Sequence, residues 1–178
     1  MLRIIVFCFL SLTFLKEQPT QNWSSNYRLQ WHDFKGEARV NSDAVAVTAS
    51  GLSFSYSTIK SNRGDLKEFN YTIEAQFYPE ESWYKKEQVN THILEHERLH
   101  FDITELFARK MRKRIESSYL TKNIDQEINR IYGETRLALS EMQKQYDSET
   151  SHSQRLENQL KWQRFIKQEL LKLAAYSS

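Results

Sequence analysis

The first half of the chain alternates apolar and polar residues with the two-residue period of β-strands. Segments 44–48 and 52–57 are rich in β-forming residues, and segment 71–78 alternates cleanly before Pro79 ends it. Ser50 and Gly51 form a turn between the first two segments, and residues 61–65 form a second turn before the third. The pattern therefore predicts an antiparallel sheet in the N-terminal half.

Apolar residues in the second half recur every three or four positions, which is the spacing of amphipathic helices. This spacing predicts helices over residues 88–117, 123–146 and 152–175. An antiparallel sheet followed by helices makes an α+β fold. The length of 178 residues fits one domain, which we place at residues 21–178.

Residues 1–20 differ from the rest. Arg3 gives a positive start, and Ile4 to Leu15 is an apolar run of about twelve residues, too short to span a bilayer but of signal-peptide length. We expect a signal peptide or an N-terminal anchor here, and therefore an exported protein, periplasmic or extracellular. The one cysteine, Cys8, lies in this run, so the cleaved protein would have neither a disulfide nor a cysteine ligand.

Charge gives little indication of a partner. The net charge of +2 is too small to favour nucleic acid binding, and any membrane contact is expected only through an uncleaved N-terminal segment. The basic run from Arg109 to Arg114 is predicted to be a solvated helix end, where cations complement the helix dipole.

The segment with the most specific chemistry is an HExxH sequence, His96-Glu97-Arg98-Leu99-His100. Residues four apart share one face of a helix, so both imidazoles can reach a single metal ion, with Glu97 beside it. A zinc hydrolase needs this arrangement, because the metal takes nitrogen ligands and a carboxylate accepts a proton from water.

The helical positions of neighbouring residues support this interpretation. A charged stripe falls on one side of the predicted helix, and the two histidines fall on the other, among Ile93, Leu99 and Ile103. Asp102 lies opposite the ligand face and is not a ligand candidate. His92 lies on the inward side one turn earlier and is a weaker candidate for a site role.

A catalytic zinc needs a third protein ligand and keeps its fourth position open. His152 is the only histidine after His100, at the predicted break between two helices, so it is one candidate; Glu149 is the rival. From spacing alone the two stay open. Asp147 or Ser148 can equally cap the next helix and leave His152 on the surface.

Two blocks of sequence resemble the DUF922 group, a family of predicted secreted zinc-dependent proteases of bacteria, and especially its Bacteroidetes-like members. They are residues 96–102 and the block Tyr146-Asp147-Ser148-Glu149-Thr150-Ser151-His152. Residues 31–36, Gln159 and Trp162 extend the resemblance over roughly residues 27–166. The resemblance implies a zincin-like helical half, a protease activity and His152 as the third ligand.

The sequence thus predicts an exported zinc metallopeptidase acting on peptides or proteins. His96, His100 and His152 would bind Zn²⁺, Glu97 would be the general base, and Tyr146 would donate a hydrogen bond to the oxyanion. Two alternatives remain. One is a non-catalytic metal-binding module. The other is a di-iron carboxylate protein, because the chain has two Glu-x-x-His pairs, at 97/100 and 149/152.

Overall fold

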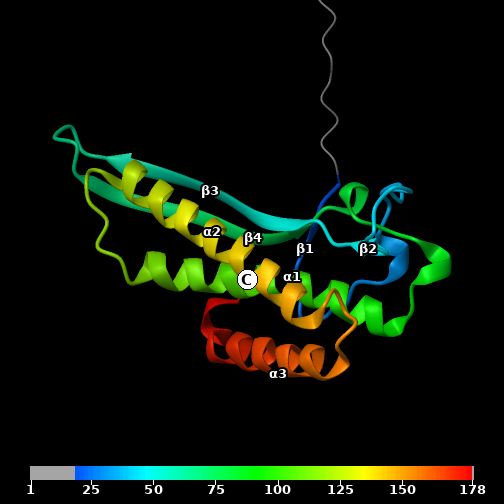
Figure 1. Cartoon of the computed structure of the whole chain (residues 1–178). Coiled ribbons are helices and arrows are strands. Elements are labelled where there is room, and N and C mark those ends of the chain that lie inside the picture. Colours follow the sequence, from blue (N-terminus) through cyan, green and yellow to red (C-terminus); the bar gives the residue numbers. More distant parts are fainter. Residues whose placement is uncertain (1–18, 178) are drawn as a thin grey trace, which may run out of the picture.

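The computed structural model describes residues 19–177, which form a small sheet region followed by three helices (Figure 1). The strands are β1 (Gln21–Asn22), β2 (Ala46–Val47), β3 (Ser50–Lys60), β4 (Leu66–Phe77) and β5 (Trp83–Tyr84). The helices are α1 (Thr91–Glu116), α2 (Ile124–Thr150) and α3 (Leu156–Lys172), with 3-10 turns at 31–33, 79–81, 86–88 and 174–176. The predicted α+β order is confirmed.

Two antiparallel sheets make up the β region. The larger has the order β1-β4-β3 and consists mainly of the long β3–β4 hairpin, while β2 and β5 form a separate two-stranded sheet. The strand predicted at 52–57 lies within β3, and the one predicted at 71–78 lies within β4 except for Tyr78, whereas the segment at 44–48 contributes only two residues. Ser50 and Gly51, predicted as a turn, are the first two residues of β3. β1 and β5 have two residues each, too few to show a sequence period.

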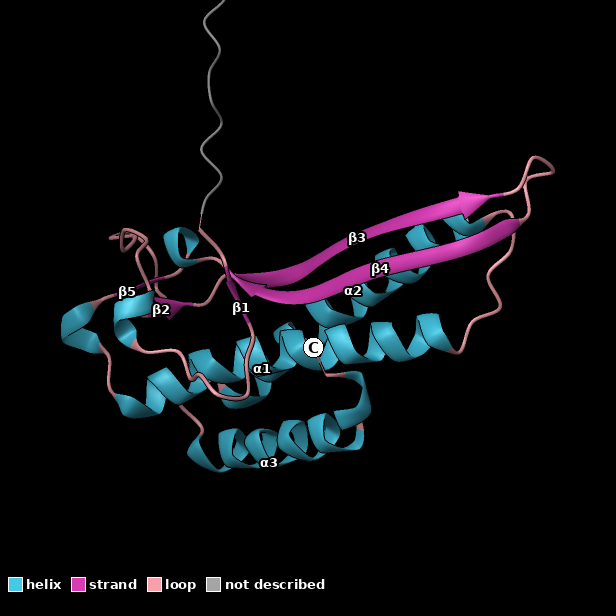
Figure 2. Ribbon diagram, turned by 180° about the vertical axis from the view of Figure 1, so that it is seen from behind, coloured by secondary structure: helices cyan, strands magenta, loops and turns pink. Residues whose placement is uncertain are grey.

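Helix α1 is the centre of the fold, as Figure 2 shows. It packs against β4, β3, α2 and α3, and its buried residues fall on every side of the helix. Helix α2 lies along the β3–β4 hairpin, where the Tyr132 hydroxyl donates to the Leu52 carbonyl at 3.1 Å. Helix α3 packs on the side of α1 and α2 that faces away from the hairpin (Figure 1).

The central place of α1 corrects, for Arg109 and Arg112, the prediction that the basic run from Arg109 to Arg114 is a solvated helix end. Arg109 and Arg112 are buried beside the buried carboxylate of Glu105, which accepts from Arg109 Nε at 2.8 Å. The two guanidinium groups also donate to the carbonyls of Leu170 and Tyr176, at 2.8 and 2.7 Å. The middle of α1 is covered on all sides, so Arg109 and Arg112 pair internally, whereas Lys113 and Arg114 in the last turn are exposed as predicted.

An aromatic cluster supports β5. The Trp31 ring stacks on Tyr84 with centroids 4.7 Å apart, and Phe34 meets Tyr84 edge-on at 6.3 Å. The N–H of Gly36 donates to the Ser82 carbonyl at 2.8 Å, and a Cβ at Gly36 would come within 2.7 Å of the Glu80 carbonyl oxygen. Only glycine fits there without a shift. The segment 31–36 therefore fixes the place of β5.

The predicted signal peptide or anchor lies outside the described residues except for its last two positions. Within residues 19–177, none of the helices has the length and apolar character that crossing a membrane requires.

Candidate metal centre

His96 and His100 lie one turn apart on α1 and face the last turn of α2. The sequence places the end of α2 at Tyr146, but the helix continues to Thr150. This extra turn carries Asp147 on the inward side of α2. The Asp147 carboxylate thereby reaches both imidazoles, which the prediction of a helix break at this point did not anticipate.

Three donor atoms converge where the two helices meet. The Nε2 atoms of His96 and His100 are 3.2 Å apart, and each is close to Asp147 Oδ1, at 3.1 and 3.0 Å. Among the described residues, these three side chains form a group whose ligand atoms all lie within 4.8 Å of one another. Ligands held at zinc distances with tetrahedral angles lie roughly 3.3–3.5 Å apart. The group is compact enough to hold one small metal ion.

The charge of this group is set by the ionised Asp147 carboxylate. Burial alone would raise the pKa of Asp147, but its contacts with the His100 and His96 rings outweigh burial and hold that pKa well below its usual value. Burial lowers the pKa of His96. Burial also acts to lower the pKa of His100, but the contact with Asp147 and the charge of Glu97 raise it, so a metal ion would have to displace a proton there. Neutral imidazole and ionised carboxylate are the forms that metal ligands need. Lone pairs of such groups repel one another at about 3 Å unless a proton or a metal ion lies between them.

Gln143, one turn before Asp147, orients His100. Its Nε2 donates to the His100 carbonyl at 2.9 Å and to Thr104 Oγ1 at 3.3 Å, so its Oε1 faces His100 Nδ1 and accepts from it. A proton on Nδ1 leaves the lone pair of Nε2 directed at the group of three donors. Thr104 Oγ1 is also 2.8 Å from Ser50 Oγ, which connects this network to the start of β3.

We expect Gln143→Leu to weaken zinc binding about 10- to 100-fold, the range found when a residue that orients a ligand is removed. Leucine keeps most of the volume but cannot accept the proton on His100 Nδ1. Zinc titration against a competing chelator measures the change. The exposed Gln145, two residues along α2, supplies the control Gln145→Leu, which leaves His100 oriented. Equal affinity for the Gln143 variant and this control would rule out an orienting role.

Glu97 lines the cleft that opens onto this group. The cleft has a volume of about 780 Å³ and is lined by segment 42–48 on one side and by α1, α2 and the loop after α2 on the other. Glu97 is only 5% exposed, and its Oε2 is buried without a hydrogen-bond partner among the described residues. Buried oxygens without a partner are rare in native proteins, and one beside a ligand group indicates a functional role.

His152 lies at the rim of the same cleft. Its Nδ1 is 3.7 Å from Asp147 Oδ1, but its side chain is 78% exposed and is not part of the group of three. It belongs to a loop in which Ser151, His152 and Ser153 all have positive φ, a strained backbone for residues with a Cβ. The structure therefore places Asp147 in contact with both histidines and places His152 outside this group of three. The role of His152 as a metal ligand stays a prediction.

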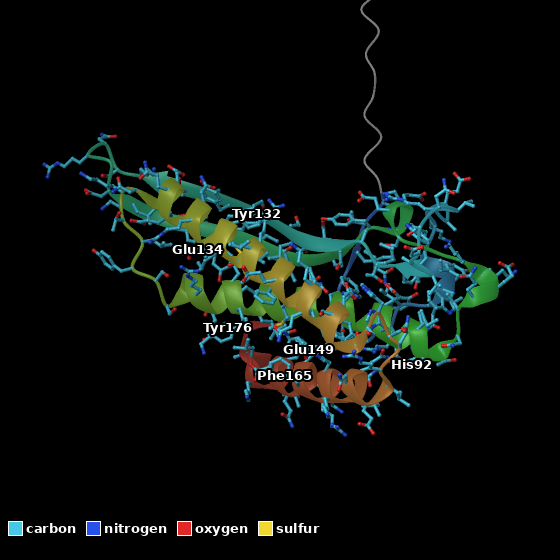
Figure 3. The ribbon with its side chains drawn as sticks, in the orientation of Figure 1. His92, Tyr132, Glu134, Glu149, Phe165 and Tyr176 are labelled. Carbon is cyan, nitrogen blue, oxygen red and sulfur yellow. The ribbon has the colours of Figure 1, made fainter. Side chains whose placement is uncertain are left out.

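His92 holds the strained loop in place. Its Nε2 donates to the Ser153 carbonyl at 2.6 Å, and Gln159 Nε2 donates to its Nδ1 at 3.3 Å. Figure 3 labels His92 near the start of α1. His92 does not line the cleft, so its position indicates a structural link between α1 and the loop.

Tyr146 and Glu149 lie behind the site. The Tyr146 ring stacks on His96 with centroids 4.5 Å apart, and its buried hydroxyl donates to the His96 carbonyl at 3.4 Å. Burial raises the pKa of Tyr146. Glu149, labelled in Figure 3, accepts from Trp162 Nε1 at 2.7 Å and from Gln145. These contacts favour packing and orienting roles. The predicted oxyanion contact of Tyr146 stays a prediction.

The Asp102 carboxylate also forms its hydrogen bonds away from His96, His100 and Asp147. It accepts from Trp23 Nε1 and from Arg28 Nη1, both at 2.8 Å, which fixes the N-terminal segment on α1.

The di-iron alternative needs Glu149 beside the histidines. In the structure the Glu149 carboxylate instead accepts a hydrogen bond from Trp162 on α3, which makes the di-iron alternative unfavourable.

One known protein family matches the part of the chain that contains the candidate metal centre. The family model described as "Bacterial protein of unknown function (DUF922)" matches residues 30–153. The chain belongs to the DUF922 family. The match begins just before the aromatic segment that supports β5 and ends in the strained loop, so it includes every residue of the metal group, while α3 lies outside it. No curated protein and no solved structure matches the chain.

Proposed function

We propose that this DUF922 protein is a zinc-dependent metallopeptidase whose metal is held by His96, His100 and Asp147. The observation that supports this proposal most directly is the convergence of three donor atoms within 3.0–3.2 Å in a cleft that Glu97 also lines. Two imidazoles and one carboxylate are a ligand set that zinc takes at catalytic sites, leaving a position open.

A zinc ion held by His96, His100 and Asp147 would supply Lewis acidity in the cleft and make water there more acidic. The residues of the chain supply the rest. Glu97, next to His96 in sequence and on the wall of the cleft, accepts the proton of the attacking water and passes it to the leaving amine. Gln143 keeps His100 in the tautomer that the site needs. His152, exposed at the rim, faces the space where a substrate enters.

The proposal includes export. The apolar run from Ile4 to Leu15 behind Arg3 is the feature of the sequence that supports it. A substrate outside the cytoplasm would then be a peptide or protein of the cell envelope or the surroundings.

Zinc-loaded protein and a library of internally quenched peptides test the activity. We expect cleavage that a zinc chelator abolishes and that added zinc restores. Without the ion, the three ligand residues cannot activate a water molecule for attack. Stoichiometric zinc without cleavage of any library member, or of an unfolded protein such as reduced casein, would contradict the peptidase proposal. That result would instead support a non-catalytic metal-binding module.

A further inference from the structure

Strand β2 has one edge that pairs with β5 and one that pairs with no strand among the described residues. Ala46 stands opposite Tyr84, and the Lys85 N–H donates to the Val45 carbonyl at 2.8 Å. In an antiparallel pair, hydrogen-bonded and non-hydrogen-bonded positions alternate. Val45 and Val47 therefore turn their main-chain groups toward β5, and Ala46 turns its N–H and C=O the other way.

The outward groups of this edge have no partner. Within the described residues, no hydrogen bond reaches the main-chain N–H or C=O of Ala46, or those of Thr48 two positions along. Ala46 is 8% exposed, and buried main-chain groups in native proteins are nearly always paired. A row of free N–H and C=O groups at two-residue spacing is the arrangement that an added strand pairs with.

This edge faces the candidate metal centre. Ala46, Val47 and Thr48 line the same cleft as His96, Glu97 and Asp147. The hydroxyl of Thr48 donates to the Glu97 carbonyl at 3.2 Å, which fixes the end of β2 against α1 beside the histidines. An extended chain that pairs with β2 would therefore pass the metal group with its main-chain carbonyls close to it.

The edge is also held rigidly. β5 is fixed by Trp31 and Gly36, and the Ser82 hydroxyl lies 2.9 Å from the Ala49 N–H, from which it accepts a hydrogen bond. Lys85 Nζ donates to the Ser42 carbonyl just before the strand. A strand fixed from both ends can pair with a ligand without first becoming ordered, which reduces the entropy that binding loses.

We propose that the substrate is an extended segment of polypeptide, bound as an added strand on the free edge of β2. This inference rests on the proposed function and names its substrate class: an unfolded or flexible chain several residues long, and neither a small amide nor a folded surface.

A scan of backbone-methylated peptides tests the pairing. The protein is zinc-loaded Glu97→Gln, in which cleavage of bound peptide is expected to be at least ~10²-fold slower. The probe is a capped, fluorescein-labelled decapeptide of alternating Val and Thr. Methylating one amide at a time removes one N–H donor. We expect affinity, measured by fluorescence anisotropy, to fall by about tenfold at every second position near the centre and to change little at the positions between. Equal losses at adjacent positions, or no binding of the probe, would overturn the inference.

Ala46→Pro tests the same edge from the protein side. Proline lacks the N–H, and the Ala46 N–H does not serve the pairing with β5, so the two-stranded sheet can remain. We expect about a tenfold loss of affinity for the unmethylated probe, with zinc stoichiometry and thermal unfolding unchanged. Ala46→Ser keeps the N–H and separates loss of the donor from a change of side chain. Parental affinity of a folded, zinc-loaded Ala46→Pro protein would contradict the inference.

The two proposals fail in different ways. Two-residue periodicity in binding without cleavage by the parent protein would refute the peptidase and leave the strand-pairing edge intact. Cleavage of peptides without any periodicity in binding would leave the peptidase intact and refute the edge.

Discussion

Asp147→Ala is expected to remove stoichiometric zinc, whereas His152→Ala is expected to keep it. Zinc sites with four protein ligands gain about 10–16 kcal/mol, or roughly 3 kcal/mol for each ligand. That is a loss of at least about a hundredfold in affinity when one ligand is removed. Asp147 touches both imidazoles, at 3.1 and 3.0 Å, so its loss affects the centre of the group. The exposed ring of His152 touches only the carboxylate, at 3.7 Å.

Competition titration and metal analysis of the purified variants measure this difference. Glu141→Ala is the matched control, because it removes one exposed carboxylate from the same helix at a distance from the group. The control and His152→Ala should bind zinc within about tenfold of the parent. If His152→Ala loses the metal and Asp147→Ala keeps it, the ligand set is three histidines, as the sequence and its family resemblance indicate.

The sequence predicts the two histidines of the group because both lie in one regular helix. A helix of known pitch fixes the relation between positions four apart, so His96 and His100 share a face before any tertiary contact is known. The third member comes from another helix, and its place depends on where that helix ends. Buried positions Leu139, Tyr146 and Thr150 keep the helical spacing to the end of α2, and this is the signal that could have located Asp147.

The polar residues around α1 could not be predicted in this way. Glu105 and Arg109 belong to the charged stripe of the predicted helix, a pattern that favours a solvated face. In the structure they are buried beneath the C-terminal residues, because α3 and the turn at 174–176 fold back over α1. The spacing of residues within one helix does not show which distant segment of the chain packs over that helix. The two-residue strand β5 is hidden for a similar reason, since its place depends on the ring contacts of Tyr84 with Trp31 and Phe34.

Substitution Glu97→Gln is expected to preserve zinc binding and to lower peptide turnover by at least ~10²-fold, the usual scale for loss of a general base. Glutamine has the shape of glutamate but cannot accept a proton at neutral pH. Glu97 is not a member of the group of three donors, so the metal should stay. The buried, unpartnered Oε2 also makes a neutral amide tolerable for folding. Turnover of a quenched peptide and the zinc content of the same sample give both measurements.

A control on the same helix makes this result specific. Glu95→Gln removes a carboxylate two residues earlier that pairs with Arg28 and Arg98 on the other side of α1 and does not line the cleft. It should keep both zinc and parental turnover, because surface ion pairs contribute little to stability. A loss of 10²-fold corresponds to about 2.7 kcal/mol of transition-state stabilisation, far beyond such a surface effect. If Glu97→Gln cleaves peptides as the parent does while Glu95→Gln also stays active, Glu97 is not the base. The water must then lose its proton to another group of the cleft, of which exposed His152 is one candidate.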